Sequence, residues 1–166
     1  HEMARLSALV SRVRMVPGGV GALSRYAYGM LGPFRFAEVQ TRLPDRAFSG
    51  RETLEVGGRK VELIEVGPAH TAGDVLVEIA DRGVVFTGDI LFNGGTPVIW
   101  AGPVRNWIAA CDRIVDAGWT TVVPGHGPLA TVDDVVAQRS YLTWLLDEVR
   151  PRQAAGMSVD ETIADI

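Results

Sequence analysis

The stretch Val122-Val123-Pro124-Gly125-His126-Gly127-Pro128 is the most informative part of this sequence of 166 residues. The apolar, β-branched run from Thr120 to Val123 predicts a short buried strand. The Pro-Gly pair that follows predicts an abrupt turn, and this turn presents a single imidazole, that of His126.

The same design occurs twice earlier in the chain. The predicted strand 61–66 leads to His70, and the predicted strand 84–87 leads to Gly88 and Asp89. Three strand ends therefore each deliver one side chain that can bind a metal. Imidazole nitrogen and carboxylate oxygen suit zinc and related divalent ions. The neighbouring glycines let the backbone turn sharply toward a shared centre.

Three motifs carry a resemblance to a known family. They are His70-Thr71-Ala72-Gly73-Asp74, Thr87-Gly88-Asp89 and Pro124-Gly125-His126-Gly127, and in order and spacing they resemble the metallo-β-lactamase superfamily of metal-dependent hydrolases. The resemblance covers about Leu54 to Val149. That family also carries an earlier His-x-His-x-Asp-His motif, which is absent here because the chain has only three histidines. We interpret the chain as the later part of a family member, cut just after the missing motif.

The resemblance implies a fold, a cofactor and a reaction. The fold is α/β (α+β), a four-layer αβ/βα sandwich of which this chain supplies the later part. Two Zn²⁺ ions are expected in the intact site, with Fe or Mn as alternatives. His70 binds one metal, His126 binds the other, and Asp89 bridges them as the catalytic carboxylate. The reaction is attack of metal-bound hydroxide on a small ester, thioester or lactone. Aspartate at position 89, rather than the cysteine of many β-lactamases, disfavours β-lactam cleavage.

Other residues have two interpretations each. Asp74 either orients His70 or caps a turn. Phe92, Asn93 and Trp100 could line the mouth of a substrate pocket, although Trp100 could equally pack its loop against a helix. Cys111 lies on the apolar face of a predicted helix and is expected to serve core packing rather than catalysis.

Two other functions compete with the hydrolase. A noncatalytic binding module would explain the missing motif, and the chain alone is expected to be inactive. A metal-dependent nuclease is disfavoured by the net charge of −4 and the scattered arginines. We expect a small-molecule substrate and no nucleic-acid partner, and we leave the oligomeric state open. No apolar run approaches the ~20 residues of a membrane span, and a single cysteine is compatible with a cytoplasmic location.

The pattern of apolar residues predicts one incomplete domain over residues 1–166. Residues 1–50 form a helical, lid-like segment with helices at 2–13 and 21–30. Residues 51–150 form the core that carries the metal-site motifs, and residues 151–166 form a C-terminal tail helix. Within the core, the patterns predict hairpins at 53–66 and 75–87, and helices from Pro103 to Ala117 and from Thr131 to about Val149.

Overall fold

The computed structural model describes residues 18–35, 39–40 and 42–166. The chain divides into two compact units, His1–Ala47 and Phe48–Ile166, which are described separately. In the first unit, helix α2 spans Gly19–Leu31, so the helix expected at 21–30 is confirmed. The helix expected at 2–13 lies outside the described residues. The lid-like role of residues 1–50 stays a prediction.

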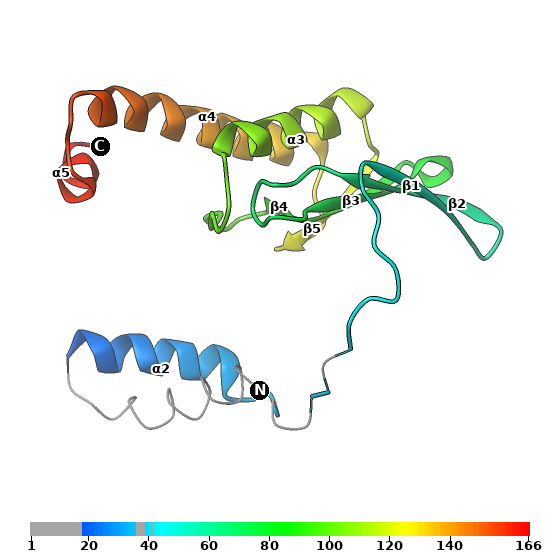
Figure 1. The fold of residues 1–166 in the computed structure, drawn as a ribbon, viewed down its shortest axis with the longest axis horizontal. Coiled ribbons are helices and arrows are strands. Elements are labelled where there is room, and N and C mark those ends of the chain that lie inside the picture. Colours follow the sequence, from blue (N-terminus) through cyan, green and yellow to red (C-terminus); the bar gives the residue numbers. More distant parts are fainter. Residues whose placement is uncertain (1–17, 36–38, 41) are drawn as a thin grey trace. The chain divides into compact units, whose positions relative to one another are not determined.

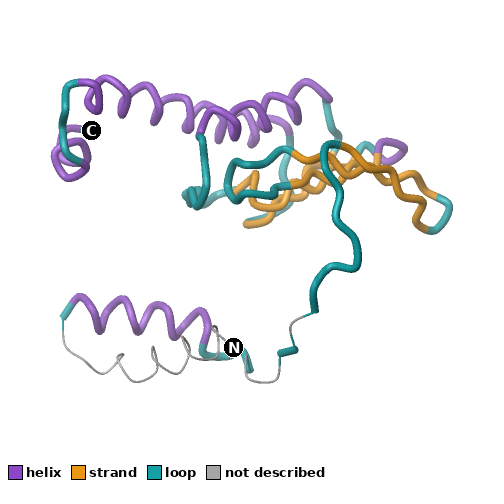
Figure 2. The backbone as a smooth tube through the Cα atoms, in the orientation of Figure 1, coloured by secondary structure: helices purple, strands orange, loops and turns teal. Residues whose placement is uncertain are grey.

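The second unit is built on a five-stranded sheet with strands in sequence order (Figures 1 and 2). The first three neighbouring pairs are antiparallel, and β4 and β5 are parallel. The turn between β1 and β2 contains Gly57 and Gly58 at φ 58° and 75°, a conformation that favours glycine. The strands are β1 Arg51–Val56, β2 Arg59–Glu65, β3 Val75–Ile79, β4 Val84–Phe92 and β5 Thr121–His126.

Two helices pack on one face of this sheet. Helix α3, Val104–Ala117, connects β4 to β5, as a parallel pair of strands requires, and α4, Val132–Ala154, follows β5. A short helix, α5, spans Val159–Asp165. The core between helices and sheet is apolar because each element contributes its inward-facing positions. Its largest fully buried side chains include Trp107, Leu76, Ile90, Leu91, Ile114 and Leu142.

The mixed α/β class is therefore confirmed. The structure describes one sheet with a helical layer on one face of it, which agrees with a chain that supplies part of a layered sandwich. Strand register also aligns a row of apolar residues across the sheet, from Leu63 through Val77 and Phe86 to Val123. Within this row, Phe86 is an exposed large apolar side chain.

Two predicted strand ends were wrong. Strand β4 continues beyond Thr87 to Phe92, and β5 continues beyond Val123 to His126. Asp89 and His126 thus lie within strands rather than after them. The reason is that parallel pairing resumes after two register shifts, with Gly88 opposite Pro124 and Phe92 opposite His126.

The predicted end of α4 near Val149 was also wrong, because the helix continues through Pro151 to Ala154. Proline cannot donate a backbone hydrogen bond, but near a helix end this removes only one bond. The Arg152 guanidinium ties this last turn to α5, because it donates to the Glu148 carbonyl at 2.7 Å and to the Asp165 carboxylate of α5 at 2.7 Å. The tail helix expected within 151–166 is present as α5, which begins with a capping box formed by Ser158 and Glu161.

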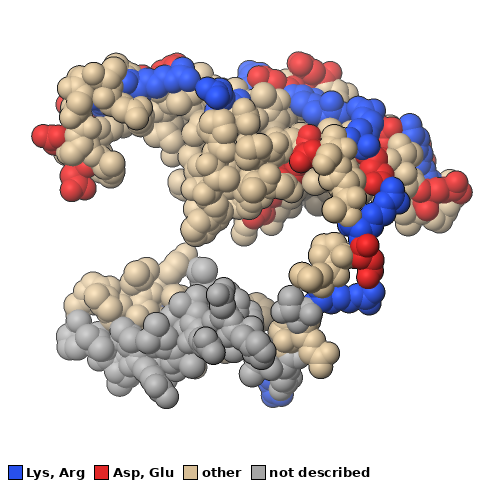
Figure 3. All heavy atoms as spheres, viewed as in Figure 1, with Lys and Arg blue, Asp and Glu red and all other residues tan. Residues whose placement is uncertain are grey.

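Charged side chains are interspersed on the surface of the second unit. Over the β1–β2 hairpin, cations and anions are interspersed on the face shown in Figure 3. In the same hairpin, Glu62 pairs with both Arg51 and Lys60, and Arg59 pairs with Asp81. This face of the hairpin carries no extended stripe of a single sign. None of the described helices combines the length and the apolar character needed to span a lipid bilayer.

Candidate metal centre

The loop that carries His70 is organised by Asp74. The buried Asp74 carboxylate accepts hydrogen bonds from the backbone N–H of Ala69 at 3.1 Å and of Thr71 at 3.0 Å, and from the Thr71 hydroxyl at 2.7 Å. The Asp74 carbonyl accepts from the N–H of Val66 and Gly67. Asp74 therefore caps the turn around His70, and these bonds go to the backbone and hydroxyl beside the histidine rather than to its ring.

The ring of buried His70 is oriented by a backbone carbonyl. Its Nδ1 lies 2.6 Å from the carbonyl oxygen of Val98. A carbonyl oxygen only accepts, so Nδ1 must donate. In the neutral imidazole, Nε2 then presents a lone pair. The same loop holds the His70 backbone, because the N–H groups of Trp100 and Ala101 donate to the His70 carbonyl at 3.0 and 3.1 Å.

The structure brings together the three metal ligands expected from the sequence. The Nε2 of His70 lies 3.3 Å from Asp89 Oδ2, and the Nε2 of His126 lies 3.5 Å from Asp89 Oδ1. Each imidazole thus faces a different oxygen of one carboxylate. The side chains are 7%, 38% and 59% exposed for His70, Asp89 and His126, so the group opens from a buried histidine toward solvent.

These separations fit donors that share a metal ion. Two ligands of one tetrahedral zinc lie about 3.4 Å apart, because each zinc–donor bond is about 2.0–2.2 Å long. The lone pair of His70 Nε2 and the Asp89 carboxylate would repel each other unless a proton or a cation lay between them. Across the part of the chain that is described, no three or more His, Cys, Asp and Glu side chains converge as a complete ion-binding group. The arrangement is instead two His–Asp pairs with a shared carboxylate.

The close approach of β5 to Asp89 requires glycine. A methyl group on Gly125 would overlap Asp89 Oδ1 and would lie 2.7 Å from the carbonyl carbon of Gly88 and 2.8 Å from the backbone nitrogen of Asp89. At Gly127, φ is 93° and an added methyl would overlap the Asn93 carbonyl. The expectation that glycines permit a close approach is confirmed at these two positions.

The Phe92 ring contacts both imidazoles. It stacks on His126 with centroids 4.5 Å apart and planes 13° apart, and it is tilted against His70 at 5.4 Å. The edge of His70 also meets Trp107, with centroids 5.5 Å apart. Phe92 therefore packs against both histidines of the group. Its expected place at the mouth of a substrate pocket stays a prediction.

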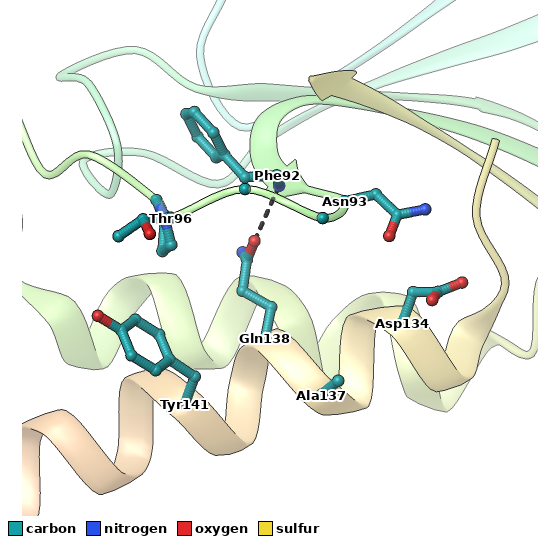
Figure 4. Close-up of a pocket in the computed structure, with 10 residues that line it drawn as sticks. Phe92, Asn93, Thr96, Asp134, Ala137, Gln138 and Tyr141 are labelled. Atoms are coloured by element: carbon teal, nitrogen blue, oxygen red, sulfur yellow. Dashed lines mark hydrogen bonds between the residues drawn. The ribbon is translucent and has the colours of Figure 1, made fainter. Parts of the chain in front are cut away.

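The other two residues predicted to line a pocket, Asn93 and Trp100, do not share a cavity. The Asn93 amide donates to the Pro128 carbonyl at 3.1 Å, which links the end of β4 to the loop after His126. Trp100 is 76% exposed, so its side chain does not pack its loop against a helix. A cavity of about 300 Å³ lies between residues 92–97 and α4, lined in part by Asn93, Gln138 and Tyr141 (Figure 4). Trp100 does not line this cavity.

Sequence reasoning missed two participants, Val98 and Gln138. Val98 acts through its carbonyl, which no side-chain pattern reveals. Gln138 had a signal, since a polar residue at 138 interrupts an apolar stripe that includes Val135 and Leu142 of α4, all three of them buried. The Cys111 prediction is confirmed: this thiol is buried in the core, and burial raises its pKa to about 12, so it is neutral near pH 7.

Comparison with known proteins shows which family the chain resembles in sequence. The sequence model of the metallo-beta-lactamase superfamily matches residues 7–126. A hydroxyacylglutathione hydrolase of Brucella anthropi is 30% identical over 114 residues, which are 67% of this chain and 42% of that protein. The acyl-coenzyme A thioesterase MBLAC2 of Bos taurus is 26% identical over 94 residues, 53% of this chain and 33% of that protein. The chain thus spans less than half the length of either relative.

Solved structures support the fold. A metallo-beta-lactamase from Pontibacter korlensis superposes with a TM-score of 0.55 at 24% identity, covering 76% of this chain and 63% of that one. The sec-alkylsulfatase Pisa1 from Pseudomonas sp. superposes with a TM-score of 0.60 at 16% identity, covering 72% and 21%. The match of the family model over residues 7–126 shows that the chain belongs to the metallo-beta-lactamase superfamily.

Proposed function

We propose that this chain contributes His70, Asp89 and His126 to the metal centre of a hydrolase. The observation that carries the proposal is the shared carboxylate: the two imidazole Nε2 atoms lie 3.3 and 3.5 Å from opposite oxygens of Asp89. Members of the superfamily generally bind metal ions, often zinc. His70 and His126 would each supply a nitrogen, and Asp89 would supply one oxygen to each side.

The chemistry of such a centre is hydrolysis. When bound, zinc lowers the pKa of a coordinated water to about 7 and polarises the group under attack. The residues of this chain hold and orient: the Val98 carbonyl keeps Nδ1 of His70 protonated, so Nε2 is the nitrogen available to a metal. The Asp89 carboxylate would supply negative charge to a cation held by the histidines, and the stacked Phe92 ring covers one face of His126.

We favour a thioester as the substrate class, within the wider set of small esters, thioesters and lactones. The curated relatives support this choice, since one is named a hydroxyacylglutathione hydrolase and another an acyl-coenzyme A thioesterase. Three protein donors cannot complete the coordination of two metal ions, which usually take four ligands each. We therefore expect the chain alone to be inactive or very weakly active.

A zinc titration tests the proposal. Calorimetry should detect zinc binding by the chain, and the variants His70→Ala, Asp89→Asn and His126→Ala should each bind zinc at least about tenfold more weakly, a loss of ~1.4 kcal/mol. His1→Ala is the matched control, because it removes the remaining histidine of the sequence and should leave the affinity unchanged. Equal affinity in all five proteins would refute the assignment of these ligands.

One observation favours a second candidate, a noncatalytic module that retains the fold. In the described ranges, no three or more candidate ligands converge as a complete ion-binding group. This candidate predicts no saturable zinc binding at all, so the same titration separates the two functions.

A further inference from the structure

The end of β4 needs a partner that the sheet does not supply. Pairing between β3 and β4 ends at Phe86, whereas β4 continues to Phe92. On the other side, the Asn93 N–H donates to the His126 carbonyl of β5 at 2.8 Å. Because successive N–H groups of a strand point to opposite edges, the Phe92 N–H faces away from β5, toward the edge that β3 has left.

Gln138 of α4 occupies that edge. Its Oε1 accepts the Phe92 N–H at 2.8 Å, and its Nε2 donates to the carbonyl of Ile90. Figure 4 shows the side chain reaching from the helix to the strand. A donor to residue 90 and an acceptor for residue 92 are what one residue of a neighbouring parallel strand would provide with its N–H and its C=O. Gln138 is only 7% exposed, so water cannot readily replace it.

We propose that Gln138 is a positioning residue for the His70–Asp89–His126 group. The backbone that it holds runs from Ile90, directly after Asp89, to Phe92, whose ring stacks on His126 at 4.5 Å and contacts His70 at 5.4 Å. The amide of Gln138 thus holds the backbone on which the Asp89 carboxylate and the Phe92 ring are both positioned. The Trp107 indole also donates to the Ile90 carbonyl, at 2.8 Å, whereas the Phe92 N–H has Gln138 as its hydrogen-bond partner.

Two variants of α4 separate positioning from general stability. Gln138→Met is similar in volume and loses both hydrogen bonds. Leu142→Ala, one helical turn further along α4, removes fully buried packing but changes no polar group. Both should lower the thermal stability of the chain, and only Gln138→Met should release the Phe92 backbone.

The first readout needs no metal. The ring protons of His126 in NMR spectra report the stacked Phe92, and Phe92→Leu gives the unstacked reference. In Gln138→Met, we expect these signals to move at least halfway to the reference, while Leu142→Ala leaves them in place. Gln138→Glu is the isosteric control: burial beside the Ile90 carbonyl favours the protonated carboxyl group, which accepts from the Phe92 N–H and donates to the Ile90 carbonyl as the amide does. Its His126 signals should therefore stay near those of the wild type even if Gln138→Met fails to fold.

The second readout is binding of Co²⁺, followed by its visible absorption. Gln138→Met should weaken binding about tenfold, as loss of a ligand-supporting residue commonly does, and Leu142→Ala should change it less than twofold. This arm rests on the proposed metal centre, and the NMR arm does not. If the wild type binds no metal but the His126 signals move, the proposed function fails and positioning stands. If Gln138→Met matches Leu142→Ala in the His126 signals, or if Gln138→Glu moves them to the unstacked reference, positioning is overturned.

Discussion

Replacing Gly125 with alanine should damage both the fold and the metal group. The added methyl would overlap Asp89 Oδ1 and press on two backbone atoms, the Gly88 carbonyl carbon at 2.7 Å and the Asp89 nitrogen at 2.8 Å. Overpacking typically costs ~1–3 kcal/mol, and since backbone atoms cannot rotate away, we expect the upper end, ~3 kcal/mol. For a chain of this length each 1 kcal/mol lowers Tm by ~2–4 °C, so Tm should fall by ~6–12 °C.

The assay combines thermal unfolding by circular dichroism with zinc titration of the folded chain. The matched control is Gly73→Ala, in the loop between His70 and Asp74, where an added methyl meets no atom within 4 Å and φ is not in the left-handed region. This control should change stability by less than ~0.5 kcal/mol. Because Asp89 must move in Gly125→Ala, zinc affinity should fall at least about tenfold.

The reasoning would be refuted if Gly125→Ala unfolded within ~2 °C of the Gly73→Ala control and bound zinc equally well. That result would mean that β5 and Asp89 are further apart in solution than the structure places them.

Three further changes test separate features of the second unit. Trp107→Phe removes one of two donors to the Ile90 carbonyl and should cost ~1 kcal/mol in urea unfolding; an unchanged midpoint would contradict this contribution. Because burial raises the pKa of Cys111 from 9.0 to about 12, the folded thiol should resist a disulfide reagent at pH 8, and fast labelling would refute its burial. The raised pKa of Cys111 leaves the free energy of unfolding unchanged below pH 9 and lowers it between about pH 9 and 12, because the thiol of the unfolded chain ionises first. In urea titrations at pH 7 and pH 10, Cys111→Ser should therefore lose less stability between the two pH values than the wild type. Ser158→Ala removes the cap of α5, and should cost ~1 kcal/mol and speed amide exchange in α5; unchanged exchange would rule the cap out as a stabiliser.

The sequence predicted correctly which three side chains lie close together, but it placed the ends of the strands that carry them less well. The order and spacing of the three motifs were enough to predict that His70, Asp89 and His126 come together, although the Pro-Gly turn expected after Val123 is part of strand β5. The strand ends were misplaced because parallel pairing at Gly88 and Pro124 is irregular, and such register shifts depend on contacts between distant segments. A propensity pattern describes only near neighbours in the chain.

The groups that support the site are bonded to partners far away in the sequence. The carbonyl of Val98 orients His70, and any residue other than Val could present a carbonyl in that place. Gln138 could have been noticed as a polar residue on an apolar stripe, but its partners at 90 and 92 are 48 and 46 residues away. Long-range backbone partners of this kind emerge only from the folded chain.

The loop from Pro97 to Gly102 holds His70 entirely through main-chain atoms: the Val98 carbonyl bonds to the ring, and the N–H groups of Trp100 and Ala101 bond to the His70 carbonyl. The side chains of Val98, Ile99 and Trp100 are exposed. Their identities can therefore drift, or be randomised in a directed-evolution library, while the histidine clamp is preserved. A loop of this kind lets selection alter what approaches the site without rebuilding the site itself.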